Sequence, residues 1–155
     1  MSNYAANTTV PVERSRGEIE RTLQRYGADS FMYGWSQDAA VVQFIADGRQ
    51  IKFVLPLPDA KDPEFTHHAR GKRTADAAQK LWEQACRSRW RALALCIKAK
   101  LEAVDSGIST FEAEFLAHTV LPDGSTVGEF IQPQIAQAYA SGKMPSMLPA
   151  LEAGS

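Results

Sequence analysis

The sequence predicts an α+β fold: a short N-terminal helix, a three-stranded antiparallel meander, one long central helix and then short C-terminal helices. Three observations support this prediction. Residues 74–104 contain no Pro or Gly and consist almost wholly of good helix formers. Residues 30–55 hold short runs of aromatic and β-branched side chains, which are typical of strands. With 155 residues, 45% of them hydrophobic, the chain is long enough to form one domain with a sizeable core.

The chain is predicted to divide into an arm, one domain and a tail. Residues 1–14 are polar, include Pro11 and show no hydrophobic period, so we expect a mobile arm. Residues 15–142 are expected to form a single α+β domain. Residues 143–155 carry prolines and scattered hydrophobic side chains, and this tail could either pack on the domain or remain free.

A short helix is predicted at the start of the domain. Ser15 and Glu18 have the spacing of a capping box, in which the serine caps the helix and the glutamate bonds back to its amide. Ile19 and Leu23 form its apolar side, and Gly27 is placed to end it.

The antiparallel meander is predicted to follow this helix. Asp47 and Gly48 stand between two strand-like runs and suit a two-residue hairpin turn with positive φ. Alternation along the flanking runs places one set of apolar side chains on a common face. Five residues are expected to face the core together: Val42, Phe44, Ile51, Phe53 and Leu55.

A charged loop is predicted to lead from the meander to the long helix. Pro56 and Pro58 end the last strand, because proline cannot donate a hydrogen bond to a sheet. Residues 59–73 are charged and are expected to form an exposed loop. His67 and His68 are adjacent and point different ways, so they are interpreted as a solvated pair and not as a metal site.

The long helix is the element around which the rest is predicted to pack. Thr74 can cap it and Gly107 can end it, so it would span roughly 31 residues, or about 46 Å at about 1.5 Å per residue. One arc of it has the spacing of a core stripe: Trp82, Cys86, Trp90, Leu93, Ala94, Ile97, Leu101 and Val104. Nearly opposite lie smaller residues that would let a second element approach closely: Leu81, Ala85, Ser88, Ala92 and Ala99.

A row of basic residues separates these two faces. Lys80, Arg87, Arg91 and Lys98 follow one another at intervals of seven, four and seven residues and so lie in line. Residues 70–100 contain nine Lys/Arg against two acidic residues, a net charge of +7, while the whole chain carries −1, so the remainder carries −8. This asymmetry creates a local positive field, although a solvated helix face is the simpler interpretation of the row.

A short helix is predicted directly after the long one. Ser109 and Glu112 repeat the capping pattern at its start. Phe111, Phe115 and Leu116 are expected to face the core from it.

One more helical region is predicted near the C-terminus. Residues 120–124 have the composition of a tight turn. Thr126 and Glu129 then open a helix, and Pro133 is expected to start a second segment, because inside a helix it would break the hydrogen-bond ladder. Gly142 is placed to end this region.

The cysteines and the absence of a membrane signal point to a cytoplasmic protein. Cys86 and Cys96 lie ten residues apart on the predicted helix, about 15 Å in rise, which is too far for a disulfide. They are interpreted as buried small hydrophobic residues in a reducing compartment. No apolar run reaches the length of a membrane span, and the N-terminus lacks the order of a signal peptide.

The sequence contains no recognisable catalytic constellation. It has neither a glycine-rich phosphate loop nor a Cys/His ligand set, so no cofactor and no metal are expected. His118 lies near Glu112, Glu114 and Asp123 and could form a His–carboxylate pair, although a histidine satisfied at a helix end is the simpler interpretation. The two glutamates would face apart on a helix and cannot act as an acid/base couple. Enzymatic activity is therefore open but unsupported.

Nucleic-acid binding is the best motivated function, with DNA rather than RNA as the expected ligand. The phosphate contacts are predicted along the row and the loop before it: Arg70, Lys72, Arg73, Lys80, Arg87, Arg91 and Lys98. Tyr33 and Trp35 are candidates for base stacking, although aromatic residues in strands more often belong to the core. A meander followed by a long helix is also the order of elements in phage single-strand annealing proteins, an analogy at the level of fold.

The chain resembles a family of small proteins from tailed bacteriophages and prophages in three ordered phrases: ADSFMYGW, IKFVLPLPD and WEQACRSRWRALALCIKAKLEAVDSGISTFEAEFLAHTVLPDGSTVGEF. The resemblance covers nearly all of residues 12–149. It implies an accessory protein that works in the cytoplasm of an infected or lysogenic bacterium, and not a virion building block. It assigns no catalytic residue.

A protein-binding module is the alternative function, for example a modulator of a host protein or of a defence system. Its working surface would be the acidic remainder of the chain, which could imitate a phosphate backbone: Asp59, Asp62, Glu64, Glu112, Glu114 and Glu129. Acidic residues scattered in this way usually serve solubility. A homodimer, formed through the small-residue stripe of the long helix, is a third possibility.

Overall fold

The computed structural model describes residues 5–144 and confirms the α+β class. Eleven elements follow in order: α1 (Val12–Tyr26), β1 (Ser30–Trp35), β2 (Ala39–Ala46), β3 (Arg49–Pro56), α2 (Pro63–Thr66), β4 (His67–His68), β5 (Gly71–Lys72), α3 (Ala75–Asp105), α4 (Phe111–Glu114), η1 (Leu116–His118) and α5 (Val127–Ser141). Strands β1, β2 and β3 form one antiparallel sheet in that order, and β4 pairs with β5 in a separate hairpin.

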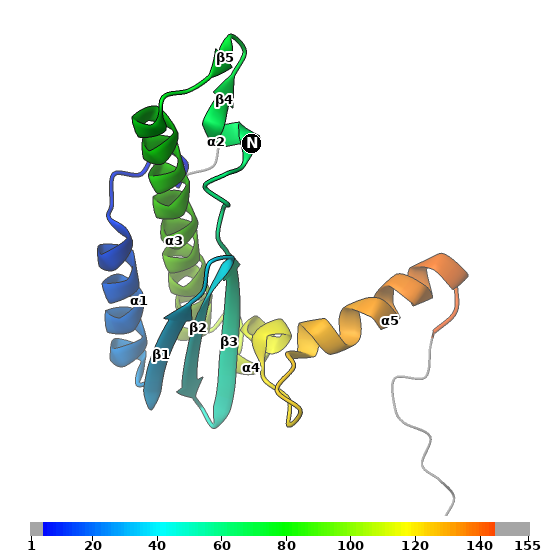
Figure 1. Cartoon of the computed structure of the whole chain (residues 1–155). Coiled ribbons are helices and arrows are strands. Elements are labelled where there is room, and N and C mark those ends of the chain that lie inside the picture. The colour runs from blue at the N-terminus through cyan, green and yellow to red at the C-terminus, as the bar shows by residue number, and fades with distance from the viewer. Residues whose placement is uncertain (1–4, 145–155) are drawn as a thin grey trace, which may run out of the picture.

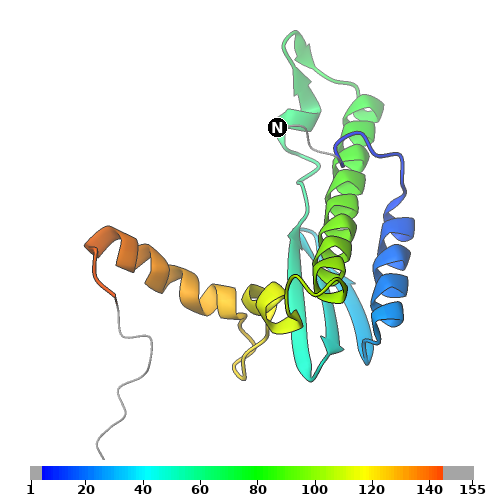
Figure 2. The same cartoon turned by 180° about the vertical axis from the view of Figure 1, so that it is seen from behind.

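Helices α1 and α3 lie side by side over one face of the three-stranded sheet (Figures 1 and 2). The core fills the space between them, and α4 and η1 close its lower end with Phe111 and Phe115. The other face of the sheet, called here the outer face, leaves large apolar side chains in solvent. Met32 is 60% exposed, Ile45 40% and Val54 50%.

The second hairpin of the meander has the predicted turn. Asp47 and Gly48 both have positive φ, 50° and 70°, as a two-residue turn of this twist requires. The register then places Phe44 opposite Ile51 and Val42 opposite Phe53, and these four side chains are buried on the core face. The predicted inward set is confirmed, with Leu55 half-buried at its end.

Helix α3 confirms the predicted long helix but packs on one flank instead of two. The hydroxyl of Thr74 accepts a hydrogen bond from the Ala77 amide at its start, and the helix runs unbroken for 31 residues. The central part of the predicted stripe is buried: Trp90, Leu93, Ala94, Ile97 and Leu101. The small-residue stripe is only partly covered within the described chain, since Ala85 and Ser88 are half-buried but Leu81 is 40% exposed and Ala92 and Ala99 are exposed. The reason is topological: the elements after α3 pack at its C-terminal end and do not return along it.

Helix α1 begins earlier than predicted. It starts at Val12, with the carbonyl of Pro11 accepting from the Arg14 and Ser15 amides, so the capping box of Ser15 and Glu18 is wrong. Ser15 is instead fully buried inside the helix, one and two turns before the core residues Ile19 and Leu23, and its hydroxyl has no hydrogen-bond partner within the described residues.

The described part of the predicted arm packs on the domain. Residues 12–14 belong to α1, and Ala5 is only 2% exposed. The side-chain amide of Gln84, on α3, donates hydrogen bonds to the carbonyls of Ala6 and Thr8. The predicted boundary at residue 15 is therefore too late. Residues 1–4, and residues 145–155 of the predicted tail, lie outside the described chain.

The connection between β3 and α3 contains more structure than a loop. Asp62 caps the short helix α2, which buries Phe65. The guanidinium of Arg73 donates to the carbonyls of Glu64 and Phe65 and so holds α2 against the start of α3. Beyond α2, β4 and β5 form an exposed hairpin whose strands include His67 and His68.

Three details of the C-terminal prediction are corrected. Thr110, and not Ser109, caps α4, because its hydroxyl accepts from the Ala113 amide. Leu116 is 56% exposed, since η1 turns it away from the core that Phe111 and Phe115 occupy. Pro133 lies inside one continuous helix, α5, which opens at the predicted residues with a capping box and extends past the proline despite a typical cost of about 3 kcal/mol.

We predict an acid-sensitive contribution to stability from His118, whose ring stacks on Phe53 with centroids 3.9 Å apart. Burial, with the nearby Lys100 ammonium, lowers the pKa of His118 below its ordinary 6.5. The unfolded chain therefore binds this proton at a higher pH than the folded one, so this contribution is complete above about pH 6.5 and is lost as the pH falls toward the folded-state pKa.

The measurement is the melting temperature of the wild type and of His118→Phe between about pH 7 and about pH 5. The variant keeps an aromatic ring on Phe53 but has no proton to bind, so its melting temperature should fall less steeply. Equal slopes for the two proteins would contradict the prediction.

Candidate functional site

An open pocket of about 820 Å³ lies beside the N-terminal half of α3. The start of α1, the turn after β1 and Leu57 form the rest of its wall. All three tryptophans of the protein, Trp35, Trp82 and Trp90, line it. We call it the tryptophan pocket.

Each tryptophan is held differently. Trp90 is 4% exposed and belongs to the core at the base of the pocket. Trp82 is half-buried, and its indole N–H donates to the carbonyl of Pro58 at 2.7 Å, which fixes its ring. Trp35, the last residue of the edge strand β1, is 73% exposed. The pocket therefore has a rigid aromatic base and an aromatic rim that solvent, or a ligand, can reach.

Two arginines line the tryptophan pocket. The guanidinium of Arg16 lies 4.5 Å from the centroid of the Tyr33 ring and 5.7 Å from that of the Trp90 ring, within cation–π range. Arg87 donates twice to the side-chain oxygen of Gln84, at 3.1 and 2.5 Å. Because Gln84 also binds the Ala6 and Thr8 carbonyls, the segment before α1 indirectly orients Arg87.

Acidic residues balance these cations. Glu13 and Glu83 line the same pocket as Arg16 and Arg87, so its formal charge is zero. The three indole rings, together with Val12 and Leu57, give the pocket wall a large apolar area. The arrangement suits a flat apolar group that carries charge at its edge, such as a nucleobase attached to its phosphate, or an aromatic side chain in a charged peptide.

Cys86 lines the pocket but has no features of a nucleophile. Burial raises the pKa of its thiol, an effect that the guanidinium of Arg87 only partly opposes. The thiol is therefore protonated near neutral pH, and the thiolate, which is the reactive form, is scarce. Cys96 is exposed, contrary to the prediction of a buried residue, because it lies beside the uncovered stripe of α3.

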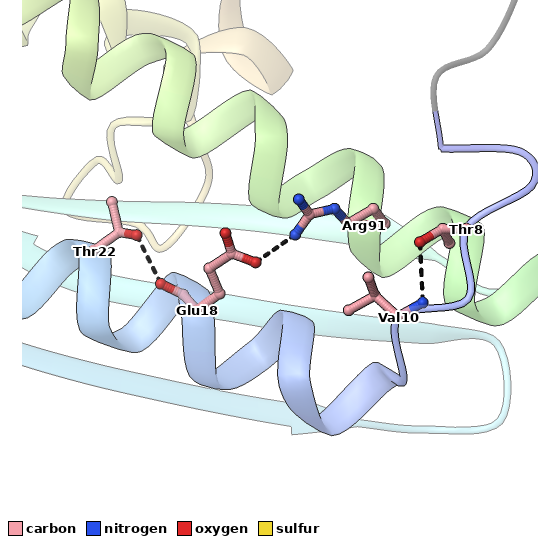
Figure 3. A network of polar contacts seen from close by, with 5 residues as sticks. All are labelled: Thr8, Val10, Glu18, Thr22 and Arg91. Atoms are coloured by element: carbon pink, nitrogen blue, oxygen red, sulfur yellow. Dashed lines mark hydrogen bonds and ion pairs between the residues drawn. The ribbon is translucent and has the colours of Figure 1, made fainter.

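The predicted basic row is interrupted at its centre. Arg91 points from α3 toward α1 and forms an ion pair with Glu18, as Figure 3 shows. The two side chains are 24% and 30% exposed. Lys80 and Lys98 remain exposed, but Lys98 lines a hollow at the far end of α3 together with Glu102, Asp105 and Arg25. The four residues do not form a continuous open row of positive charge.

The three basic residues that were predicted before α3 as phosphate contacts also differ in their roles. Arg70 and Lys72 are exposed on the β4–β5 hairpin, which stands at the N-terminal end of α3, the end that also holds the tryptophan pocket (Figure 1). Arg73 has a structural role, because both hydrogen bonds of its guanidinium tie α2 to the start of α3.

No metal or acid/base site emerges from the described residues. Among residues 5–144, no group of three or more His, Cys, Asp or Glu side chains could hold a metal ion. His118 contacts Phe53 and the backbone of Lys52, and no His–carboxylate pair occurs in the described chain. Within the same residues, no helix is both long and apolar enough to span a membrane.

Sequence reasoning assigned Trp82, Cys86 and Trp90 to the core and so missed the pocket. A signal was present in the element lengths. A 31-residue helix is about 46 Å long, whereas an eight-residue strand is about 27 Å, so roughly 20 Å of the helix must extend past the sheet. Aromatic residues in the first turns of the stripe therefore had no sheet to cover them.

We predict that Arg91 and Glu18 are energetically coupled. In a double-mutant cycle with Arg91→Ala and Glu18→Ala, measured by urea unfolding, the coupling should reach up to about 1 kcal/mol, as expected for a partly exposed ion pair. Arg25 and Glu20, exposed charges on the same helix α1, provide control substitutions to Ala that should each change the free energy of unfolding by less than about 0.5 kcal/mol. A coupling of zero would mean that Arg91 is available to a ligand after all.

The comparisons with known proteins add no further constraint on the pocket. No protein-family model, curated protein or solved structure matches the chain.

Proposed function

We propose that the protein binds single-stranded nucleic acid, DNA in the first place, with bases stacked at the tryptophan pocket and phosphates on the cations around it. The observation that carries this proposal is Trp35, a large aromatic side chain left 73% exposed at the rim of a pocket that Trp82 and Trp90 also line. An indole ring exposed at the rim of an aromatic pocket offers a flat face on which a nucleobase can stack.

The geometry favours a single strand over a duplex. Stacking needs an open base face, which a duplex hides, and it contributes about 1–3 kcal/mol per base. A duplex would depend on an open row of phosphate contacts, and the ion pair of Arg91 with Glu18 interrupts that row. We therefore retain nucleic-acid binding, the function predicted from the sequence. Its proposed site is the tryptophan pocket beside α3 and not the row of basic residues along that helix.

Five of the cations surround one end of the molecule. Arg16 and Arg87 line the pocket, Lys80 is exposed one turn from it on α3, and Arg70 and Lys72 are exposed on the hairpin beyond. None of the five forms an ion pair within residues 5–144. A strand that leaves the pocket toward the hairpin would meet positive charge along its path, and each neutralised phosphate adds about 0.7 to the salt slope of single-strand binding.

The resemblance to tailed-phage and prophage proteins supports a setting for this activity. Single strands are exposed during replication and recombination, so we place the protein in one of these phage processes, in the host cytoplasm.

A protein-binding role is the second candidate, and one observation favours it. Glu13 and Glu83 neutralise Arg16 and Arg87 within the pocket, so its field does not select a polyanion strongly. A peptide segment of a host protein, with an aromatic anchor and charges of both signs, would fit the same surface. Its binding would depend only weakly on salt.

We predict that the wild type binds a fluorescently labelled single-stranded oligonucleotide at micromolar concentration, with affinity that falls as salt rises. Trp35→Ala should weaken binding about tenfold, because one stacked base is lost, while Trp35→Tyr should retain most of it. Fluorescence anisotropy across a salt series gives the affinities, and quenching of tryptophan fluorescence reports the contact directly.

Matched controls come from the same chain. Lys80→Glu should weaken binding, whereas Lys98→Glu, the same charge reversal on the same helix but beside Glu102 and Asp105, should not. Ile108→Ala removes an 82% exposed hydrophobic side chain elsewhere and should have no effect. Salt-insensitive or absent binding would reject the proposal, and a partner captured from host lysate through Trp35 after nuclease treatment would favour the protein-binding role.

A further inference from the structure

Helix α5 projects from the body of the protein as an arm (Figures 1 and 2). It touches the rest of the fold through η1 at its base. Of its 15 residues in the described chain, Gly128 alone is buried. An isolated helix of this length is marginal in water, and Pro133 weakens it further. The arm therefore calls for a contact that residues 5–144 of a single copy do not provide.

One side of this arm is apolar. Placed at 100° per residue, its aromatic and branched aliphatic side chains fall on one half of the helix: Val127, Phe130, Ile131, Ile135 and Tyr139. Gln134 and Ala138 lie on the same half, and Ala136 and Ala140 lie on the other. Phe130 is 51% exposed, Ile135 41% and Tyr139 88%. A half-apolar helix with large exposed side chains is typical of one that packs into a groove.

The base of the arm fixes its direction away from its own sheet. Thr126 and Glu129 form a complete capping box. A methyl group at Gly128 would lie 3.0 Å from the carbonyl oxygen of Ala117, so the helix sits tightly on η1 there. Val120 and Thr126 form a bridge directly before the helix. The arm could not fold back onto the sheet of its own chain without breaking these contacts.

The outer face of the sheet is the complementary unfilled surface. Met32, Ile45 and Val54 are exposed on it, as given above. Beside them lies a hollow of about 520 Å³, whose floor includes Gln43, Gln50 and Lys52 and whose wall is the loop of residues 120–124. A sheet needs a second layer over an apolar face, and α1 and α3 cover the opposite face.

Charge does not oppose this contact. The alternation of β1, β2 and β3 leaves Lys52 as the one charged side chain on the outer face. Glu129 is the one charge among the residues of α5, and at 100° per residue it lies on the half of the helix opposite the apolar side. Charged residues make up 23% of the chain, so a helix side without charge and a sheet face with a single charge are unusual on it. Neither surface would repel the other when they meet.

We propose that the protein forms a two-fold dimer in which α5 of each copy packs on the outer face of the sheet of a second copy. Both halves of the contact are present in one chain, so two copies satisfy each other reciprocally and the assembly closes. The loop of residues 120–124 walls the groove and leads directly into the arm, which places the departing arm beside its own groove and next to a partner. The dimer is independent of nucleic-acid binding, since the tryptophan pocket lies on the side of α1 and α3.

Sedimentation equilibrium of the full chain tests the dimer. The wild type should approach twice its chain mass of 17.0 kDa at micromolar concentration. Ile135→Glu on the arm and Ile45→Glu on the outer face place the same charge on two isoleucines of nearly equal exposure, 41% and 40%. Each should raise the dissociation constant at least about tenfold. Ala136→Glu, an exposed position next to Ile135 but on the polar half of the arm, should leave it unchanged.

A mixing experiment identifies the exchange of arms. Ile135→Glu keeps an intact groove and Ile45→Glu keeps an intact arm, so an equimolar mixture should form heterodimers with one native contact, although each variant alone is monomeric. A monomeric wild type overturns the proposal. A dimer that Ile135→Glu leaves intact also overturns it, because the arm is then not part of the contact. A dimer that Ile135→Glu breaks but Ile45→Glu leaves intact overturns it as well, because the arm then binds elsewhere, for instance on the small-residue stripe of α3. Circular dichroism of every variant confirms that the body remains folded.

Discussion

The structure depends on the packing of α3, a helix much longer than the strands it covers. Its middle packs on the sheet and beside α1 through Trp90, Leu93 and Ile97. Its N-terminal turns extend beyond the sheet and need other cover, which comes from the segment before α1, from Pro58 and from the α2 helix. This cover is incomplete, because these segments are short, and the tryptophan pocket is the space that they leave.

The same packing decides what the basic residues of α3 can do. Arg91 forms an ion pair with Glu18 on α1, Arg87 is oriented by Gln84, and Lys100 donates to the carbonyl of Glu114. A segment that is strongly basic in sequence thus presents a divided surface, since neighbouring elements bring carboxylates and carbonyls to its cations. Near the pocket, fewer cations of the described chain remain without an ion pair than the sequence suggests. These cations surround an aromatic surface.

The fold also leaves two apolar surfaces without cover in the described residues: the outer face of the sheet and one side of α5. Both surfaces are uncovered because favourable contacts in neighbouring parts of the fold fix where these residues point. The register of β2 and β3 commits Val42, Phe44, Ile51 and Phe53 to the core, which sends Ile45 and Val54 outward. The capping box and the tight seat of Gly128 send α5 away from the body.

Properties set by near neighbours in the chain were determined by the sequence alone: the extent of α3, the Asp47-Gly48 hairpin, the inward set of the sheet and the start of α5. Contacts between distant residues were decided by the tertiary structure. Local spacing could not show that Glu18 would meet Arg91 rather than cap a helix, since 73 residues separate them. Nor could the periodicity of α3 distinguish a tryptophan under the sheet from one beyond its end, because a helical stripe records direction around an axis and not which partner, if any, lies there.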